Sequence, residues 1–320
     1  MTFYTGSATS LEQIQTALID ACENHGWVWS SGVLAKGDLF VAIMISGAHL
    51  LFEGRTSADA GAMPSRVKIG QLYSGFSGAA SDPTYDFTYP CTYDIHINEG
   101  PDEIYLIIQY ETDRYQWVFF GKSNIQNLPG SGFYVAAIMG GDTPQGSVAG
   151  RGPIVIGTDY AGYAAVSGVY GTPAAFALSA YRPNASAWTV SVNTLVHSGL
   201  DSQHWILAAT ATGDIPGVRV IKELLETQPS AWSSESALIP MRAYKVRNAF
   251  RLSLVVDLVH ARHIRLDNYE PGQIIYRGSE RWKVYPWHRK NSVSRNGSPS
   301  SSSGVDHTGT FGFAIRYEGP

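Results

Sequence analysis

The sequence contains little charge: Asp, Glu, Lys and Arg make up only 16 % of its 320 residues, against about 25 % in typical soluble domains. It has only two cysteines, Cys22 and Cys91. These are too few for a disulfide framework or a cysteine-rich zinc site, so we expect two free, buried thiols in a reducing compartment. No apolar run approaches the roughly 20 residues that span a bilayer, and residues 1–6 lack the features of a secretion signal. We therefore expect no membrane partner and no export.

The sequence also lacks the motifs that mark common catalytic sites. It has no Gly-x-Ser-x-Gly elbow, no phosphate-binding glycine loop ending in Lys-Ser/Thr, no dinucleotide fingerprint and no His-Glu-x-x-His. Asp257, His260 and His263 form the most suggestive cluster. However, the alternating pattern over 252–259 predicts a strand, on which residues three apart point to opposite faces. We predict that these residues are structural, that the protein is not an enzyme, and that it binds no metal, nucleotide or other cofactor.

What the sequence does contain is glycine and aromatic residues, with 33 Gly, 18 Tyr and 8 Trp, a composition typical of short strands joined by turns. One helix is indicated near the start, where Ser10 can cap it and Gln13 completes a capping box. Apolar residues then recur at helical spacing, and Asn24-His25-Gly26 ends the helix. The apolar positions are Leu11, Ile14, Leu18 and Cys22.

After the helix the pattern becomes short and strand-like. Strands are predicted over 27–29, 39–45, 50–52, 93–97, 104–110, 116–121, 174–180, 188–196, 205–211, 242–246, 251–265, 273–276, 282–285 and 311–317, with a short helix over 218–225. Gly37-Asp38 is predicted to form the hairpin turn between the first two strands. This order predicts an α+β fold that is predominantly antiparallel β. The N-terminal helix is expected to pack on a β-meander, and a second β-rich domain is expected to follow.

A Gly/Pro-rich stretch that begins at residue 140 marks the expected domain boundary. The prediction is an α+β domain over 1–140, a linker or long loop over 141–153, and a β-rich domain with a basic C-terminal segment over 154–320. The Ser-rich stretch 294–304 has nothing to bury and is predicted to be a loop.

Charge is divided unevenly along the chain. Residues 240–320 hold 13 Lys and Arg against 6 Asp and Glu, a net charge of +7, which with a total of −4 leaves −11 for residues 1–239. The basic residues are spaced through apolar strands. This favours contact between copies, the basic end of one against the acidic body of another, over specific nucleic-acid binding. We expect a row of basic side chains on one sheet face in such an interface, formed by Arg262, Arg265, Arg277 and Arg281.

The last segment alternates large apolar and small or polar residues. Phe311, Phe313, Ile315 and Tyr317 recur every second residue and therefore share one face of a strand. We predict that residues 310–320 form a docked strand, which pairs either with a sheet of this subunit or with the edge of a neighbour. The four large side chains are therefore further candidates for the subunit interface.

Two other uses of the sequence compete with an assembly role. Aromatic residues two apart, such as Tyr285 and Trp287, suit a carbohydrate- or receptor-binding surface, although sheet core or a subunit interface is the commoner use. The acids Glu99, Asp102 and Glu103 fall at a strand turn, where two of them could form the carboxylate pair of a glycan hydrolase. A solvated hairpin tip is the simpler interpretation of these acids.

Three stretches of the sequence resemble a known class of protein. They are residues 3–8 before the helix, residues 282–291, and residues 307–320 at the end. In these stretches the chain resembles virion structural proteins of tailed bacteriophages, the mid-sized chains of the tail, whereas its middle has no such likeness. The resemblance lies in local stretches and brings no catalytic residues with it.

The resemblance implies a non-enzymatic structural subunit of a bacteriophage virion, assembled in the host cytoplasm. It implies a ring of identical copies, expected to be hexameric, at the tail neck (the collar or terminator region) or at the baseplate. Neighbouring tail or neck proteins would be the other partners. Such rings form when a head-to-tail contact closes on itself. The first alternative is a carbohydrate- or receptor-binding module of the virion, and the second is a glycan hydrolase.

Overall fold

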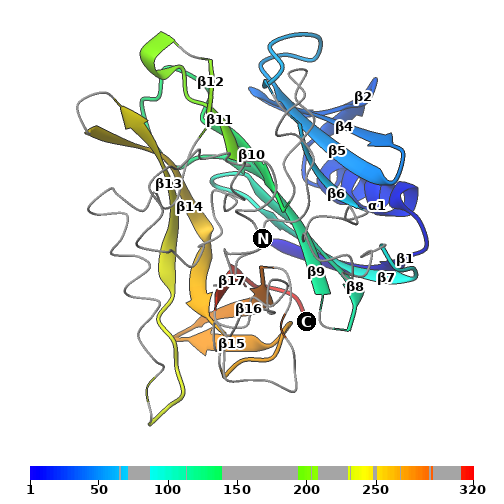
Figure 1. Cartoon of the computed structure of the whole chain (residues 1–320), viewed down its shortest axis with the longest axis vertical. Coiled ribbons are helices and arrows are strands. Elements are labelled where there is room, and N and C mark those ends of the chain that lie inside the picture. Colours follow the sequence, from blue (N-terminus) through cyan, green and yellow to red (C-terminus); the bar gives the residue numbers. More distant parts are fainter. Residues whose placement is uncertain are drawn as a thin grey trace, which may run out of the picture.

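The computed structural model describes residues 1–64, 66–70, 87–112, 114–138, 194–202, 204–207, 230, 232–247, 251–266, 268–287, 290 and 311–320. These residues form one α-helix, one 3₁₀ turn (Leu200–Ser202) and 17 strands in three antiparallel sheets (Figure 1). The predicted fold class, a β-rich α+β fold with an N-terminal helix on a sheet, is confirmed. The predicted linker 141–153, the strand 174–180, the helix 218–225 and the loop 294–304 lie outside the described residues.

The predicted helix is present as α1 (Leu11–Glu23). The Ser10 hydroxyl accepts the backbone N–H of Gln13 at 3.4 Å, as expected of the cap. The Gln13 side chain accepts the N–H of Thr9 at 2.7 Å, one residue before the position that a capping box uses. The helix buries its apolar side against the sheets, through Leu11, Ile14, Leu18 and Cys22.

The N-terminal five-stranded sheet runs in sequence order. Its strands are β2 (Val28–Ser30), β3 (Val33–Lys36), β4 (Leu39–Ser46), β5 (His49–Arg55) and β6 (Val67–Gly70). The turn at Gly37-Asp38 joins β3 to β4, so the predicted hairpin between the first two strands is wrong. Sequence reading missed β3 because a second turn precedes it: Ser31 and Gly32 both have positive φ, at 50° and 81°, as a tight two-residue hairpin turn requires.

The seven-stranded sheet has the order β1-β7-β8-β9-β10-β11-β12. Its strands are β1 (Thr2–Ala8), β7 (Cys91–Asn98), β8 (Glu103–Glu111), β9 (Arg114–Lys122), β10 (Phe133–Ala137), β11 (Thr194–His197) and β12 (Trp205–Leu207). The last two come after the predicted linker, yet β11 pairs with β10 in this sheet. Strands on both sides of the predicted boundary thus share one sheet.

The C-terminal five-stranded sheet has the order β13-β14-β17-β16-β15. Its strands are β13 (Ile239–Arg247), β14 (Arg251–Arg265), β15 (Ile274–Arg277), β16 (Glu280–Pro286) and β17 (Phe311–Arg316). The last strand of the chain lies in the middle, paired with β14 on one side and β16 on the other. The prediction of a docked final strand is confirmed, and the sheet that holds it belongs to the same chain.

The seven-stranded sheet is the middle of three layers (Figure 1). Alternate side chains of β9 reach the two outer sheets: the Phe119 ring lies 5.1 Å from Phe313 of β17, and the Phe120 ring lies 5.8 Å from Trp27, which precedes β2. One cluster of buried side chains therefore runs from α1 through the middle sheet to β17. We call the contact between the middle sheet and the C-terminal sheet the sheet junction.

Candidate functional site

The four arginines expected to form an interface row do not share one sheet face. The register of β14 to β17 puts Arg262 and Arg277 on one face of the C-terminal sheet and Arg265 and Arg281 on the other. Arg265 is buried, and the guanidinium of Arg262 lies over the Trp282 ring at 5.3 Å. The expectation of a single row is wrong. Arg262 and Arg265 are three apart on β14 and therefore point to opposite faces, and the pairing of β15 with β16 puts Arg277 and Arg281 on opposite faces as well.

The apolar candidates of the last segment pack inside the chain. Phe313 and Ile315 are fully buried in the sheet junction, and the ring of Tyr317 lies 4.9 Å from that of Phe3. The guanidinium of Arg281 lies over the ring of the same tyrosine at 5.3 Å. The side chain of Phe311 lies outside the described part of the structure. An assembly surface must therefore be sought elsewhere.

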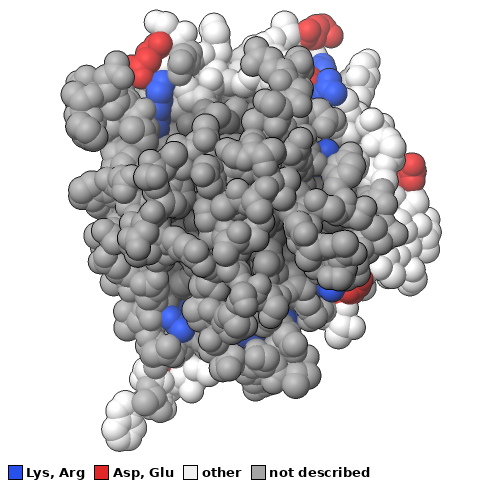
Figure 2. Space-filling model, in the orientation of Figure 1, with Lys and Arg blue, Asp and Glu red and all other residues white. Residues whose placement is uncertain are grey.

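Basic residues of the C-terminal region meet acids of the same chain. The amine of Lys283 lies 2.6 Å from a carboxylate oxygen of Asp94, and that of Lys245 lies 3.0 Å from Asp201. On the face drawn in Figure 2, the described Lys and Arg side chains appear as separate spots, several of them beside Asp or Glu. At these contacts the basic C-terminal region thus forms ion pairs with the acidic remainder of the same chain, and not with a second copy.

The three acids predicted at a strand turn have two different environments. Glu99 and Asp102 lie at the turn between β7 and β8, where the Lys36 amine is 3.8 Å from Glu99 and 2.7 Å from Asp102. Glu103 is fully buried. The interpretation of all three as a solvated tip is wrong for Glu103, because β8 turns this side chain toward the C-terminal sheet.

Glu103 joins the two sheets at an irregularity of β14. The pairing of β13 with β14 shifts register between Pro240 and Arg242. Near this shift, the backbone N–H groups of Val259 and His260 donate to the Glu103 carboxylate at 2.8 and 2.9 Å, and the Tyr105 hydroxyl donates to it at 2.6 Å. Burial raises the pKa of Glu103 to about 7, although these three donors oppose that shift.

A second polar chain crosses the sheet junction beside β1. The Tyr285 hydroxyl donates to Asp94 at 2.8 Å and lies 2.9 Å from Nε2 of His96. Burial lowers the pKa of His96 to about 3, so its ring is neutral. The Tyr285 hydroxyl thus lies within hydrogen-bond distance of both Asp94 and His96. Asp94, His96 and Tyr285 thus link the middle sheet to the C-terminal sheet.

The cluster Asp257, His260 and His263 lies on β14, so its strand interpretation is confirmed. Asp257 pairs with Arg242 at 2.8 Å. Both histidines are buried, and burial lowers the pKa of His263 to about 3. Within the described ranges, no three His, Cys, Asp or Glu side chains are grouped so that they could hold a metal ion, and no helix is long and apolar enough to cross a membrane.

The segment before β13 holds a tryptophan out into solvent. Trp232 is 99 % exposed. It sits in a tight turn in which the N–H of Ser234 donates to the carbonyl of Ser230 at 2.7 Å, and the N–H of Trp232 donates to the Ser230 hydroxyl at 3.2 Å. In Figure 1 this segment is the extended stretch at the lower left that leads up into β13.

The turn is anchored to β15, the edge strand of the C-terminal sheet. The Arg277 guanidinium donates to the carbonyl of Ser236 at 2.9 Å and lies 3.3 Å from Glu235. It also donates to the carbonyl of its neighbour Tyr276 at 2.9 Å, and Tyr276 is itself 65 % exposed. We call Trp232, Glu235 and Arg277 the tip surface. One of the predicted interface arginines thus lies in it.

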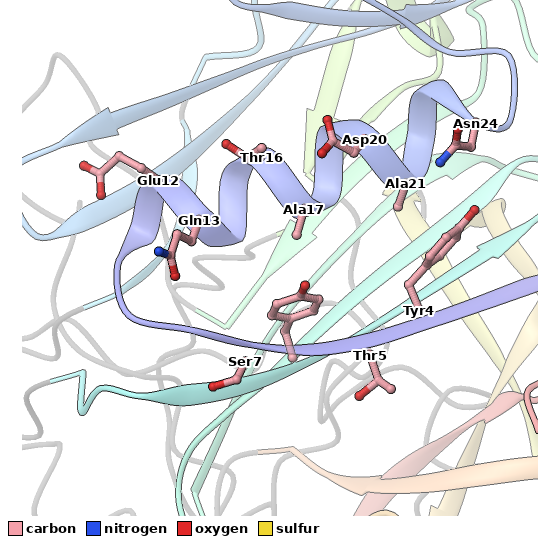
Figure 3. Close-up of a pocket in the computed structure, with 11 residues that line it drawn as sticks. Tyr4, Thr5, Ser7, Glu12, Gln13, Thr16, Ala17, Asp20, Ala21 and Asn24 are labelled. Atoms are coloured by element: carbon pink, nitrogen blue, oxygen red, sulfur yellow. The ribbon is translucent and has the colours of Figure 1, made fainter.

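A groove opens between α1 and β1. It has a volume of about 560 Å³ and is shown in Figure 3. There Ala17 and Ala21 of the helix point toward the strand and Tyr4 points up toward Asn24, whereas Thr5 and Ser7 point away from the helix. The lining residues are Tyr4, Thr5, Ser7, Glu12, Gln13, Thr16, Ala17, Asp20, Ala21, Asn24 and Tyr93. We call this the α1–β1 groove; none of the three acids at the β7–β8 turn lines it.

Two tyrosines of the groove are held in place by the chain around them. The Tyr4 hydroxyl lies 3.2 Å from Nε2 of His25. Tyr93 pairs with Gly6 across β1 and β7, and its ring covers that glycine so closely that an added Cβ would lie 2.4 Å from the hydroxyl oxygen. Any other residue at position 6 would push Tyr93 aside.

Sequence reading missed both the tip surface and the groove. Trp232 stands among serines, at 230 and 233–234, and an isolated tryptophan in a polar stretch was the available signal. A glycine within a strand often marks the close approach of another group, but no strand was predicted around Gly6 from the sequence, so this signal for Tyr93 was not available.

The fold is that of a β-rich α+β protein in which buried ionisable groups join the sheets. Its surface carries an exposed tryptophan on an anchored turn and a polar groove between α1 and β1. The chain matches no protein-family model, and no curated protein matches it.

Proposed function

We propose that the protein is a non-enzymatic structural subunit of a larger assembly, which it enters through the tip surface. The observation that carries this proposal is the 99 % exposure of Trp232 on a hydrogen-bonded turn. Tryptophan, tyrosine and arginine are the residues that dominate binding energy at protein interfaces. The hydrogen bonds of the turn already order its backbone, so docking through this turn costs less conformational entropy.

The buried ionisable residues support an assembly role over catalysis, because their side chains bind other groups of the same chain and thereby hold the sheets together. Glu103 accepts two hydrogen bonds across the sheet junction and one from Tyr105 of its own strand, and Asp94 binds both Tyr285 and Lys283 at the junction. A catalytic carboxylate has to reach a substrate, whereas these are committed to protein partners.

The particle we propose is the virion of a tailed bacteriophage, in keeping with the resemblance of the terminal stretches. In that proposal the subunit is assembled in the host cytoplasm and forms a ring, expected to be hexameric, at the tail neck or baseplate, in contact with neighbouring tail or neck proteins. A tip on one copy that meets a different surface on the next is a head-to-tail contact, the kind that closes into rings.

Locating the chain in particles tests the proposal. Antibodies against the purified protein should label virions at the tail neck or at the distal end of the tail in electron micrographs, and mass spectrometry should detect the chain in purified virions. If the chain were missing from the particles that its source produces, the proposal would be wrong.

A tryptophan variant tests the surface itself. Trp232→Ala should leave the folded structure intact, because the side chain is solvated, but should reduce incorporation into particles. Val28→Ala, at a residue 62 % exposed on β2, is the matched control and should assemble normally. Equal incorporation of the wild type and the Trp232 variant would remove the tip surface from the proposal.

A further inference from the structure

We infer that the α1–β1 groove binds an uncharged carbohydrate. Its volume of about 560 Å³ falls within the range of roughly 300–1,000 Å³ that is typical of small-molecule sites. The groove is formed by α1, β1 and β7, whereas the tip surface lies on the C-terminal sheet. This activity is therefore separate from the assembly role and needs no catalysis.

The first argument is the pair of ordered aromatic rings. Tyr4 is fixed at its hydroxyl by His25, whose other ring nitrogen lies 3.4 Å from Glu99. Tyr93 is fixed by lying across Gly6. The faces of sugar rings present C–H groups, which pack on the faces of aromatic rings. A tyrosine that is already ordered costs less conformational entropy when a ligand packs on it.

The second argument is the helix side of the groove. The small side chains of Ala17 and Ala21 leave room opposite Tyr4 (Figure 3). Around them, Gln13, Thr16, Asp20 and Asn24 offer amide, hydroxyl and carboxylate groups. Each sugar hydroxyl both donates and accepts a hydrogen bond, so it can use all three kinds of group. Apart from the two tyrosines, the described residues of the lining include no apolar side chain larger than alanine, which disfavours an apolar ligand.

The third argument is charge. Glu12 and Asp20 line the groove, and no Lys, Arg or His is among the described residues of its lining. A hydrogen bond from Ser10 lowers the pKa of Glu12, so that its carboxylate is ionised at neutral pH. Two carboxylates beside which the described lining places no basic side chain repel phosphate, sulfate and sialic acid groups. Among carbohydrates the groove therefore selects those without negative charge.

Titration of the full-length chain with defined sugars tests the inference. The probes are the uncharged trisaccharides maltotriose, cellotriose and N,N′,N″-triacetylchitotriose, with sialyllactose as the anionic counterpart and spermine as a cation. Saturation-transfer NMR detects binding, and calorimetry measures it. We expect at least one uncharged trisaccharide to bind and to bind more tightly than sialyllactose. Failure of all three to bind, or tighter binding of spermine than of every trisaccharide, would overturn the inference.

Variants then assign the binding to this groove. Tyr4→Ala and Tyr93→Ala should each weaken it about tenfold or more, the usual effect of truncating an aromatic anchor. Tyr276→Ala, at an exposed tyrosine on β15, is the matched control and should bind as the wild type does. If either tyrosine variant failed to fold, Asp20→Ala and Gln13→Ala, on the exposed side of α1, would replace it and should also weaken binding. Undiminished binding in the folded groove variants would show that the sugar binds elsewhere.

Discussion

The sheet junction and the α1–β1 groove both combine carboxylates with tyrosines, yet they are built in opposite ways. At the junction, Glu103 is fully buried and accepts three protein hydrogen bonds. In the groove, Glu12 and Asp20 are exposed on α1. A buried carboxylate whose donors are all protein groups holds the fold together, whereas an exposed one remains accessible to a ligand. The environment of the acid, and not its chemistry, decides which of the two roles it has.

The largest expected effect comes from removing the strand that completes the junction. A chain that lacks residues 310–320 loses β17 from the middle of its sheet, together with the buried Phe313, Ile315 and Tyr317. Each such side chain contributes about 1.5–3 kcal/mol when buried, and a whole domain has only about 5–15 kcal/mol to lose. We expect no cooperative thermal transition by circular dichroism. A chain shortened by residues 318–320 alone keeps β17 and should still unfold cooperatively.

Replacing the buried carboxylate should come next in size. Glu103→Leu leaves the backbone N–H groups of Val259 and His260 buried without an acceptor, which should lower the free energy of unfolding by about 3–5 kcal/mol. Glu103→Gln keeps one acceptor oxygen and should cost less. Urea denaturation of both variants measures the effect. If Glu103→Leu were as stable as the wild type, these hydrogen bonds would not hold the sheets together.

The same residue predicts a pH dependence. The pKa of Glu103 is about 7 in the folded chain, against 4.5 for an unperturbed glutamate. The folded state therefore holds this proton more tightly than the unfolded state does, so the contribution of Glu103 to stability is full below pH 4.5 and is lost as the pH rises to 7. The expected loss over this range is about 3 kcal/mol.

The buried histidines give the stability of the folded chain a pH dependence opposite to that of Glu103. The lowered pKa values of His96 and His263, both about 3, make the folded chain less stable as the pH falls below 6.5. The difference between the wild type and Glu103→Gln at each pH isolates the glutamate, because the histidines are common to both chains. A difference that stays constant from pH 4.5 to 7 would contradict the raised pKa of Glu103.

The smallest expected effect on stability is in the groove. Asp20→Asn changes an exposed carboxylate on α1 and should alter the free energy of unfolding by no more than about 0.5 kcal/mol. The same denaturation experiment measures it, with Asp59→Asn, another exposed acid, as the control. A loss as large as that of Glu103→Leu would erase the distinction between the two regions.

Some predictions from the sequence held because they depend only on neighbouring residues. The helix α1 follows from an apolar period of 3.6 residues, and the strands β14 and β17 follow from a period of 2. The missed strand β3 shows the limit of this approach, since two consecutive turns within a few residues were read as one.

The candidate sites were predicted far less well, and for one reason. Periodicity says which side chains share a face, but not which face another layer covers. Arg265 is buried while Arg262 packs on Trp282, and only Arg277 of the four arginines lies in the tip surface. Glu103 is separated by some 156 residues from the N–H that it accepts, so no local pattern could mark it.

The sequence by itself therefore determined part of the elements of this protein: one capped helix, several of the short strands, and a last strand with one apolar face. Only the tertiary structure decided how these elements combine. It placed β11 and β12 in the middle sheet, gave the basic residues acids of the same chain, and laid Tyr93 over Gly6. The physical reason is that helices and strands follow from local side-chain spacing, whereas burial, ion pairing and grooves arise where residues distant in the chain meet.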